Sequence, residues 1–300
     1  MPRPSRTVDR IQEVTLTAEN RAAREIARVY NQARRELVAT LLERWTGSTA
    51  LRPQDAIDLL RRLNLLDQVN ARLLQLERET GLILRDVVTS STERALDNVN
   101  RELRMLPTEL RTDVRPFSRI NTQMAERFVP LVLDNAGQAA QTLGMTIRRE
   151  LQAGLLQGES FPNLVSRLMA ADSGAFARGR NSAVLAARRT VITAENAAKQ
   201  EYYEQTKRDI PEVKKQAIAV VQSRTTDCCL RVHGQIVDVD EPFTLTGTPR
   251  FADRMQHPSF HWNCRTAVGM YHPSFESGGL TTANMRSSAQ AELRRRREAA

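Results

Sequence analysis

The chain has 300 residues, of which 41% are hydrophobic, 26% charged and 5% aromatic. This is enough chain for one large or two medium domains, and no apolar run reaches the length that a membrane span needs. Lysine and arginine together number 44 against 35 aspartate and glutamate, and the resulting net charge of +9 suits an anionic partner. Three cysteines cannot form a disulfide framework and favour a reducing compartment, and the first residues, MPRPSRTVDR, do not resemble a secretory leader.

The first hundred residues predict helices joined by short connections. Apolar residues recur every three or four positions, which places them on one buried stripe of each helix. Gly47 ends the first helix, Pro53 suits the first turn of the second, and Thr80 with Gly81 separates the second from the third. The predicted helices therefore cover residues 18–45, about 53–79 and about 82–103.

The second hundred residues continue the helical pattern. Pro107 and Pro116 bracket a loop, and Pro130 is expected to kink or split the helix that follows. Pro162 starts a short helix, and the small residues 172–180 predict a further loop. The longer predicted helices of this part cover residues 122–143, 145–156 and 181–207.

The character of the sequence changes near residue 210. Two short runs, 216–221 and 235–239, predict strands, the second because apolar and polar residues alternate in it. From Gly278 onward the chain is polar and ends in four adjacent arginines, Arg294–Arg297. Because like charges repel one another, we expect a basic tail that is mobile until it binds an anion.

Together these patterns predict a mostly α fold. An elongated helical N-terminal region is followed by a small α+β C-terminal domain with short strands and a cysteine/histidine cluster. No internal repeat is found in the 300 residues. We divide the chain into an N-terminal helical region, 1–106, a second helical region ending in a long helix, 107–210, a small Cys/His domain, 211–277, and a basic polar tail, 278–300.

All three cysteines and all four histidines gather in the last third of the chain, in the order Cys228, Cys229, His233, His257, His261, Cys264 and His272. Zinc sites commonly take two ligands from one tight turn and two from a second segment, and they mix thiolate with imidazole. The candidate metal ligands of this kind are Cys229, His233, His261 and Cys264. Cys228 and His257 can substitute for their neighbours, since adjacent side chains on a strand point opposite ways.

Three interpretations of this cluster stay open. A structural zinc ion would stabilise a small domain that has few apolar residues. Alternatively, the fold is metal-free and uses these side chains as polar contacts. In the third interpretation Cys229 is a nucleophile, with His233 or His261 as its base. Asp227 or Asp240 would then orient the base, but no glycine-rich oxyanion loop adjoins the cysteine, so we assign no catalytic residue.

Three runs around the cluster carry a family pattern, Ser223–Cys229, His233–Gln235 and His257–Arg265. They resemble the C-terminal signature of the phage head morphogenesis proteins, the Mu protein F-like or minor head proteins of tailed phages. The matching positions are Asp227, Cys229, Gly234, Pro258, His261, Cys264 and Arg265, and the preceding helix is similar at Arg189, Thr190, Glu195 and Asn196. The sequence departs from the family at Val191, where members often have glutamate, and at Thr266, where a further cysteine is frequent. The resemblance covers about residues 155–270.

The resemblance implies a structural virion component that binds portal protein, major capsid protein or both inside the head. Several copies around a symmetric ring would assist head assembly or the packaging and ejection of DNA. We therefore expect that the chain has no enzymatic activity and does not associate with a membrane. It is expected in the host cytoplasm before assembly and in the capsid interior or at the portal vertex afterwards. Arg294–Arg297 are candidate contacts to the phosphates of packaged DNA. The alternative is an enzyme, a nuclease or ADP-ribosyltransferase-like effector that uses the Cys/His cluster.

Overall fold

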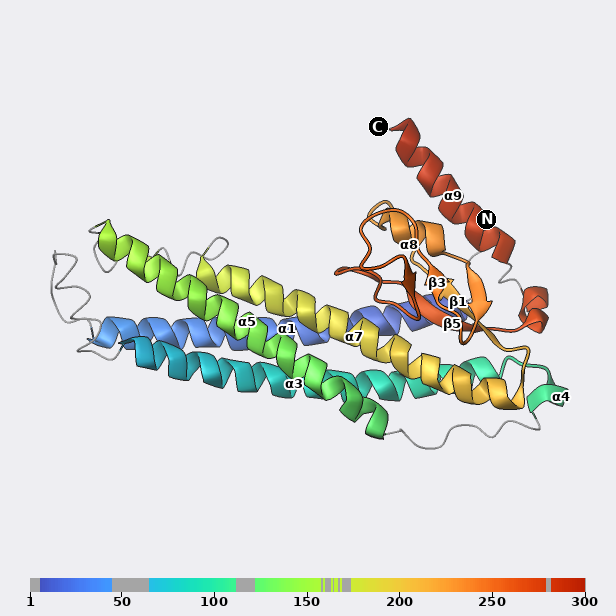
Figure 1. Ribbon diagram of the computed structural model, residues 1–300, viewed down its shortest axis with the longest axis horizontal. Helices are drawn as coiled ribbons and strands as arrows, with labels where there is room; N and C mark the ends of the chain where they lie inside the picture. The colour runs from blue at the N-terminus through green and yellow to red at the C-terminus, as the bar shows by residue number, and fades with distance from the viewer. Residues whose placement is uncertain are drawn as a thin grey trace. The chain divides into compact units, whose positions relative to one another are not determined.

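Long helices dominate the structure, which is a computed structural model of the chain (Figure 1). It describes residues 6–44, 65–111, 122–157, 159, 163, 165–166, 168, 174–278 and 282–299. Within these ranges the strands are short and all follow the long helices, which confirms the predicted fold class with its C-terminal Cys/His cluster. No helix of the described ranges is both long and apolar enough to cross a membrane.

The described ranges contain four long helices, α1 (Arg6–Arg44), α3 (Leu65–Leu103), α5 (Thr122–Leu156) and α7 (Ala175–Asp209). The predicted break at Thr80 and Gly81 is wrong, because α3 continues through both residues. The apolar stripe explains this continuity, since Leu76 and Leu84 on either side of Gly81 are both buried at helical spacing. A glycine inside a helix costs only about 1 kcal/mol, which packing of this stripe outweighs.

Helix α5 also runs through positions where interruptions were expected. Pro130 lies inside it and is exposed. Because proline has no N–H group, the Glu126 carbonyl four residues earlier receives no helical hydrogen bond from it, and Glu126 is exposed as well. The expected break between residues 143 and 145 is absent. Gly144 is buried there, and a Cβ on it would lie 2.9 Å from Leu73 Cδ1, so the missing side chain permits close packing of α5 on α3. The expected helix starts at Pro53 and Pro162 lie outside the described residues. The loop expected between Pro107 and Pro116 is helical at Thr108–Arg111, and the rest of it lies outside the described residues.

The chain forms two compact units, and each is assembled from separate stretches of sequence. Unit 1 contains residues 1–20, 87–128 and 188–300, and unit 2 contains residues 21–86 and 129–187. The units cut across the four consecutive segments expected from the sequence. The reason is a shared core in unit 1, where Val99 of α3, Tyr203 of α7 and Val268 near the C-terminus are buried together.

A three-stranded antiparallel sheet in unit 1 positions the C-terminal site. Its order is β2-β1-β5, with β1 (Lys214–Ile218) between β2 (Ile236–Asp238) and β5 (Ala267–Tyr271). In register, Gln216 of β1 pairs with Ile236 on one side and with Gly269 on the other. The first two strands overlap the predicted runs, whereas β5 was not predicted. Two further strands, β3 (Phe243–Thr244) and β4 (Arg254–Met255), pair with one another.

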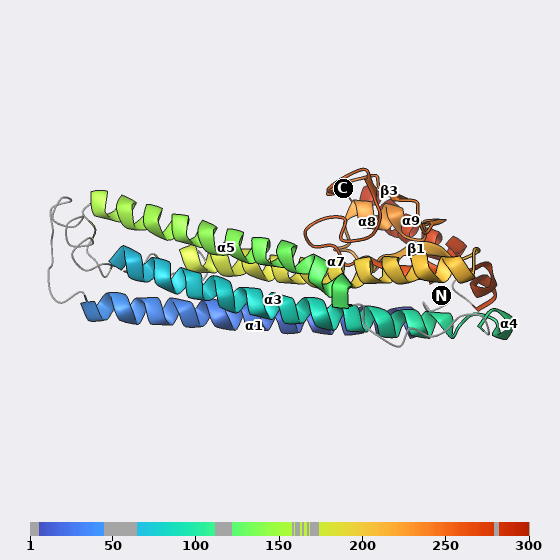
Figure 2. The same cartoon turned by 60° about the horizontal axis from the view of Figure 1, so that its bottom comes forward.

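The C-terminal part of α7 lies along this sheet, as Figure 1 and Figure 2 both show. The Val268 amide of β5 donates a hydrogen bond of 2.6 Å to Asn196 Oδ1 of α7. Further along, Tyr203 donates its hydroxyl proton to Glu102 Oε2 of α3 at 2.6 Å, and the Met270 amide donates to the same oxygen at 3.3 Å. Buried polar contacts therefore fix β5 on both α7 and α3.

The chain ends in a helix, α9 (Thr282–Glu298), so the expectation of a mobile tail is wrong. Met285 and Ala289, one helical turn apart, are buried, and α9 contacts the short helix α8 (Asp227–Val232). These two apolar side chains provide the packing that the charge pattern alone did not reveal. The remaining short elements are α4 (Thr108–Arg111) and the 3-10 helix η1 (Pro273–Gly278).

Candidate metal centre and adjoining pocket

Helix α8 presents two adjacent cysteines. It begins at Asp227, whose Oδ2 accepts a hydrogen bond of 2.7 Å from Arg231 Nε one turn later. Cys228 and Cys229 are both buried. The sequence interpretation assumed a strand here, where neighbouring side chains point to opposite faces. On a helix they are about 100° apart, so both thiols can reach the same site. Gly234, with φ of 77°, follows the helix and lets the chain turn into β2.

The second pair of candidate ligands comes from the loop between β4 and β5. Phe260 anchors this loop, because its buried ring packs edge-on against Phe243 of β3 with the ring centroids 6.0 Å apart. The Cys264 amide then donates a hydrogen bond of 3.2 Å to the His261 carbonyl. This turn places the side chains of His261 and Cys264 side by side, while Trp262 between them is 54% exposed.

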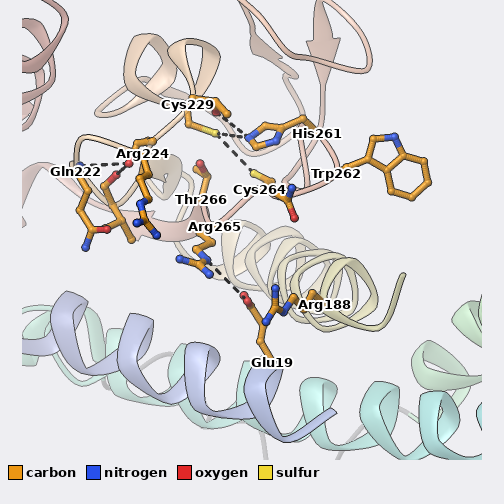
Figure 3. A pocket seen from close by; sticks show the side chains of 15 residues that line it. Glu19, Arg188, Gln222, Arg224, Cys229, His261, Trp262, Cys264, Arg265 and Thr266 are labelled. Atoms are coloured by element: carbon orange, nitrogen blue, oxygen red, sulfur yellow. Dashed lines mark hydrogen bonds and ion pairs between the residues drawn. The ribbon is translucent and has the colours of Figure 1, made fainter. Parts of the chain in front are cut away.

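The two pairs meet in one buried cluster (Figure 3). Cys229 Sγ lies 3.1 Å from His261 Nε2 and 3.8 Å from Cys264 Sγ. The candidate ligand atoms of Cys228, Cys229 and His261 all lie within 4.8 Å of one another. Thr226 Oγ1 also contacts His261 Nε2, at 2.8 Å. Three of the four predicted ligands are therefore brought together, and the predicted substitute Cys228 lies beside two of them, Cys229 and His261.

Hydrogen bonds inside the cluster favour deprotonation of two cysteines. A hydrogen bond from the Cys229 thiol lowers the pKa of Cys228 to about 6. Burial alone would raise the pKa of Cys264, but hydrogen bonds with Cys229 and His261 outweigh burial and hold it well below the ordinary value. Cys229 keeps its proton, because hydrogen bonds to Cys228 and Cys264 raise its pKa. Burial opposes a charge on His261, yet its contacts with Cys264 and Cys228 raise its pKa overall. The lowered pKa values of Cys228 and Cys264 favour the thiolate, the form of cysteine that binds metal.

The other three histidines have different partners. His233, a predicted ligand, accepts a hydrogen bond of 2.9 Å at Nδ1 from the Ala219 amide, and burial lowers its pKa to about 4. His257, the predicted substitute, has its Nδ1 2.7 Å from its neighbour's carbonyl, that of Pro258. His272 Nδ1 lies 2.7 Å from the Ser274 hydroxyl. The structure does not bring these rings into the cluster.

A cavity of about 410 Å³ adjoins the cluster, which forms part of its wall. Three arginines also line the cavity, Arg188 of α7, Arg224 before α8 and Arg265 after the cluster (Figure 3). Glu19 of α1 lies at the far side, with its Oε2 3.9 Å from Arg265 Nε. Burial raises the pKa of the Glu19 carboxyl to about 7, against the attraction of Arg265 and Arg188. The cavity therefore combines sulfur, imidazole, guanidinium and carboxyl groups.

Sequence reasoning did not identify Glu19 or Arg188 as part of this site. No local pattern marks Glu19, because its partner Arg265 lies near the opposite end of the chain. Arg224 and Arg265 both fall in the runs that carry the family pattern, and only their shared cavity distinguishes them from the other arginines.

The family-like residues of α7 hold secondary structure elements together. The Glu195 carboxylate accepts hydrogen bonds from Thr15 of α1 at 3.2 Å and from Asn98 of α3 at 3.1 Å. Its neighbour Asn196 binds β5 as described above. These two residues therefore join α1, α3 and β5 to α7, and neither lines the cavity beside the cluster.

The terminal arginines cannot act as one patch. Four consecutive residues of a helix point in directions about 100° apart, so Arg294–Arg297 cannot all face a single anion. Arg295 and Arg296 form ion pairs with Glu292, at 2.9 Å and 3.0 Å. Arg296 also donates to the Gln222 carbonyl at 2.9 Å, which ties α9 to the loop before α8. Arg294 and Arg297 are exposed.

The fold and the cluster define a class of protein in which long helices carry a small α+β domain with a Cys/His centre. Residues 145–269 match the family described as phage Mu protein F like protein. The matched segment runs from α5 to β5 and contains the whole cluster. This match confirms that residues 145–269 resemble the phage head morphogenesis proteins. No curated protein and no solved structure matches the chain.

Proposed function

We propose that the chain is a minor head protein of a tailed bacteriophage, a structural component of the virion. In this role it binds portal protein, major capsid protein or both inside the head, in several copies around a symmetric ring, and assists assembly or the packaging and ejection of DNA. The observation that carries the proposal is the family match over residues 145–269, which includes the complete Cys/His cluster. The long helices support it, because they offer extended surfaces for protein partners.

Purified particles of the phage that encodes the chain test this role directly. Mass spectrometry of the particles is expected to detect the chain, and cryo-electron microscopy to locate it at the portal vertex or inside the capsid. Deletion of its gene is expected to reduce the yield of infectious heads. Particles that lack the chain, or normal heads after deletion, would refute the proposal.

The cluster in this proposal is a structural zinc site held by Cys228, Cys229, His261 and Cys264. Two sulfur atoms bound to one zinc ion at 2.3 Å in tetrahedral geometry lie about 3.8 Å apart, which matches the Cys229–Cys264 distance of 3.8 Å. Zinc would link α8 to the loop before β5, and such sites contribute folding free energy to small domains with few apolar residues. Elemental analysis of the pure chain tests it.

The structure supplies two ligand variants and a matched control for this measurement. His261→Ala and Cys264→Ser are expected to lose zinc and to lower the melting temperature. His233→Asn keeps a hydrogen-bond acceptor for the Ala219 amide and is expected to retain one zinc per chain. Wild-type chain without metal, or zinc loss in the His233 variant alone, would contradict the ligand set. A Cys229–Cys264 disulfide found by mass spectrometry would contradict it as well.

Packaged DNA is a further partner in the proposal, contacted through phosphates by the exposed Arg294 and Arg297 of α9. The double variant Arg294→Gln/Arg297→Gln is expected to weaken DNA binding uniformly across sequences and to flatten its salt dependence. Unchanged binding would remove α9 from the contact.

The proposal also takes the chain to be a non-enzyme. The purified chain is expected to show neither nuclease activity nor consumption of NAD. Turnover that disappears in His261→Ala would favour an effector enzyme instead.

A further inference from the structure

The cavity beside the Cys/His cluster contains buried polar atoms that lack partners. Glu19 Oε1, Arg188 Nε and Thr266 Oγ1 have no hydrogen-bond partner within the described chain, and all three residues line this cavity. Glu19 is 3% exposed and Thr266 only 1%. Most buried polar groups in proteins are hydrogen-bonded, so three such atoms around one cavity indicate a ligand that supplies the missing contacts.

From these contacts and the charges around them, we propose that the cavity binds a phosphate monoester. Arg188, Arg224 and Arg265 line it, and Glu19 is the only carboxylic acid among the lining residues. Figure 3 shows Arg224 and Arg265 directed into the same space, with the sulfur atoms of the cluster near His261 on the opposite wall. Among the described residues, the polar contact of the Arg265 side chain is the ion pair with Glu19 at 3.9 Å, which is too long for a hydrogen bond. Guanidinium groups are therefore available to an anion.

The number of donors favours phosphate over a carboxylate. Each guanidinium offers a planar fork that fits phosphate or carboxylate oxygens. Three such forks and the Thr266 hydroxyl exceed what the two oxygens of one carboxylate can accept, whereas a phosphate presents three terminal oxygens. A monoester carries about −1.5 to −2 charges near neutral pH, which suits three guanidinium groups opposed by the Glu19 carboxyl and by the low-pKa Cys264 thiol in the same wall.

The size of the cavity indicates that the phosphate is attached to a larger group. Its volume of about 410 Å³ falls within the range of ligand pockets of about 300–1,000 Å³. A free nucleoside monophosphate and the terminal phosphate of a nucleic acid strand both present this chemistry. The site differs from the proposed DNA contacts on α9, because those would meet phosphodiesters along the backbone.

Binding of nucleotides to the purified 300-residue chain tests the inference. Isothermal titration calorimetry compares a nucleoside 5′-monophosphate with the same nucleoside, and a 5′-phosphorylated oligonucleotide with its 5′-hydroxyl form. Saturable binding is expected only for the phosphorylated member of each pair. Tighter binding of the free nucleotide identifies a small-molecule ligand, and tighter binding of the phosphorylated oligonucleotide identifies a strand end.

Substitutions locate the site. Arg224→Gln and Arg265→Gln are each expected to weaken binding about tenfold or more, because each removes a charged hydrogen-bond donor. Glu19→Gln is expected to strengthen binding, since it removes the opposing carboxylate. Arg208→Gln is the control, because it changes the net charge equally at an exposed position of α7 outside the cavity. Circular dichroism establishes that the variants, whose altered arginine side chains are exposed, remain folded.

Several results would overturn the inference. One is the absence of saturable binding. Another is an affinity for the nucleoside or for a dicarboxylate equal to that for the phosphorylated ligand. The last is a loss of affinity in Arg208→Gln as large as that in the cavity variants. The first would mean that water alone fills the cavity. Because the isolated chain is used, these outcomes are independent of whether the chain is found in phage particles, so the two proposals fail separately.

Discussion

Replacement of the buried Glu19 by glutamine is expected to stabilise unit 1 at alkaline pH and to change little at acidic pH. Glu19 is 3% exposed, and burial raises the pKa of its carboxyl from 4.5 to about 7. A carboxyl group whose pKa is raised on folding stabilises the fold at low pH. That contribution is lost as the pH rises from about 4.5 to about 7. Above this interval the buried charge costs free energy that a neutral glutamine does not incur.

The magnitude follows from the pKa change. One pKa unit corresponds to about 1.4 kcal/mol, so a rise from 4.5 to about 7 corresponds to about 3 kcal/mol when the carboxyl is fully ionised. This value already contains the attraction of the two neighbouring arginines, Arg265 and Arg188. Between about pH 5 and about pH 8, the free energy of unfolding of Glu19→Gln should therefore rise relative to wild type by about 2 to 3 kcal/mol.

Urea unfolding at about pH 5 and about pH 8, followed by tryptophan fluorescence in reducing buffer, measures this difference. The acid-sensitive His233 is present in both proteins, so its contribution cancels when the variant is compared with wild type. Glu13→Gln, at an exposed position of the same helix, is the control and should show no such pH-dependent difference. A Glu19→Gln effect of equal size at both pH values would refute the reasoning.

Three further predictions concern unit 1. Burial lowers the pKa of His233 to about 4, so the neutral ring stabilises the fold above pH 6.5, and this stabilisation is lost as the pH falls towards 4. In urea unfolding, the free energy of unfolding of His233→Asn should therefore fall less between these pH values than that of wild type, by up to about 3 kcal/mol. Tyr203→Phe removes a hydrogen bond of 2.6 Å to the buried Glu102 and should lower the free energy of unfolding by about 1–3 kcal/mol, whereas an unchanged value would mean that the carboxyl finds another donor. Gly247→Ala should lower the melting temperature through a cost of about 1–3 kcal/mol, because φ is 83° and the new Cβ would lie 2.5 Å from Asp227 Oδ2.

The periodicity of apolar residues predicted the fold class because it is a local property. It failed at Gly81 and Gly144, where glycine suggested a helix end but tertiary packing keeps the helix intact. At Gly144 the absence of a side chain serves the contact with Leu73 on another helix. It failed again at α9, where a small apolar contact through Met285 outweighs the charge of the arginines.

The candidate site was predicted in part from residue types and spacing. Cys229, His261 and Cys264 meet as the pattern suggested, since a turn and a short helix place them. His233 has the same residue type and a suitable spacing, but its ring faces the backbone amide of Ala219. Glu19 lies beyond any spacing rule, because a cavity wall assembled from the two ends of the chain leaves no local signal in the sequence.

The discontinuous make-up of unit 1 has a consequence for synthesis of the chain. Residues 1–20 leave the ribosome well before residues 188–300, which complete the same unit. At about 5–20 residues per second, the first segment waits about 15 to 55 s until the last of residues 188–300 is made. Unit 1 therefore cannot form before residues 188–300 have been synthesised, and a fragment limited to the family-matched residues 145–269 would lack α3, one of the two helices that contact β5.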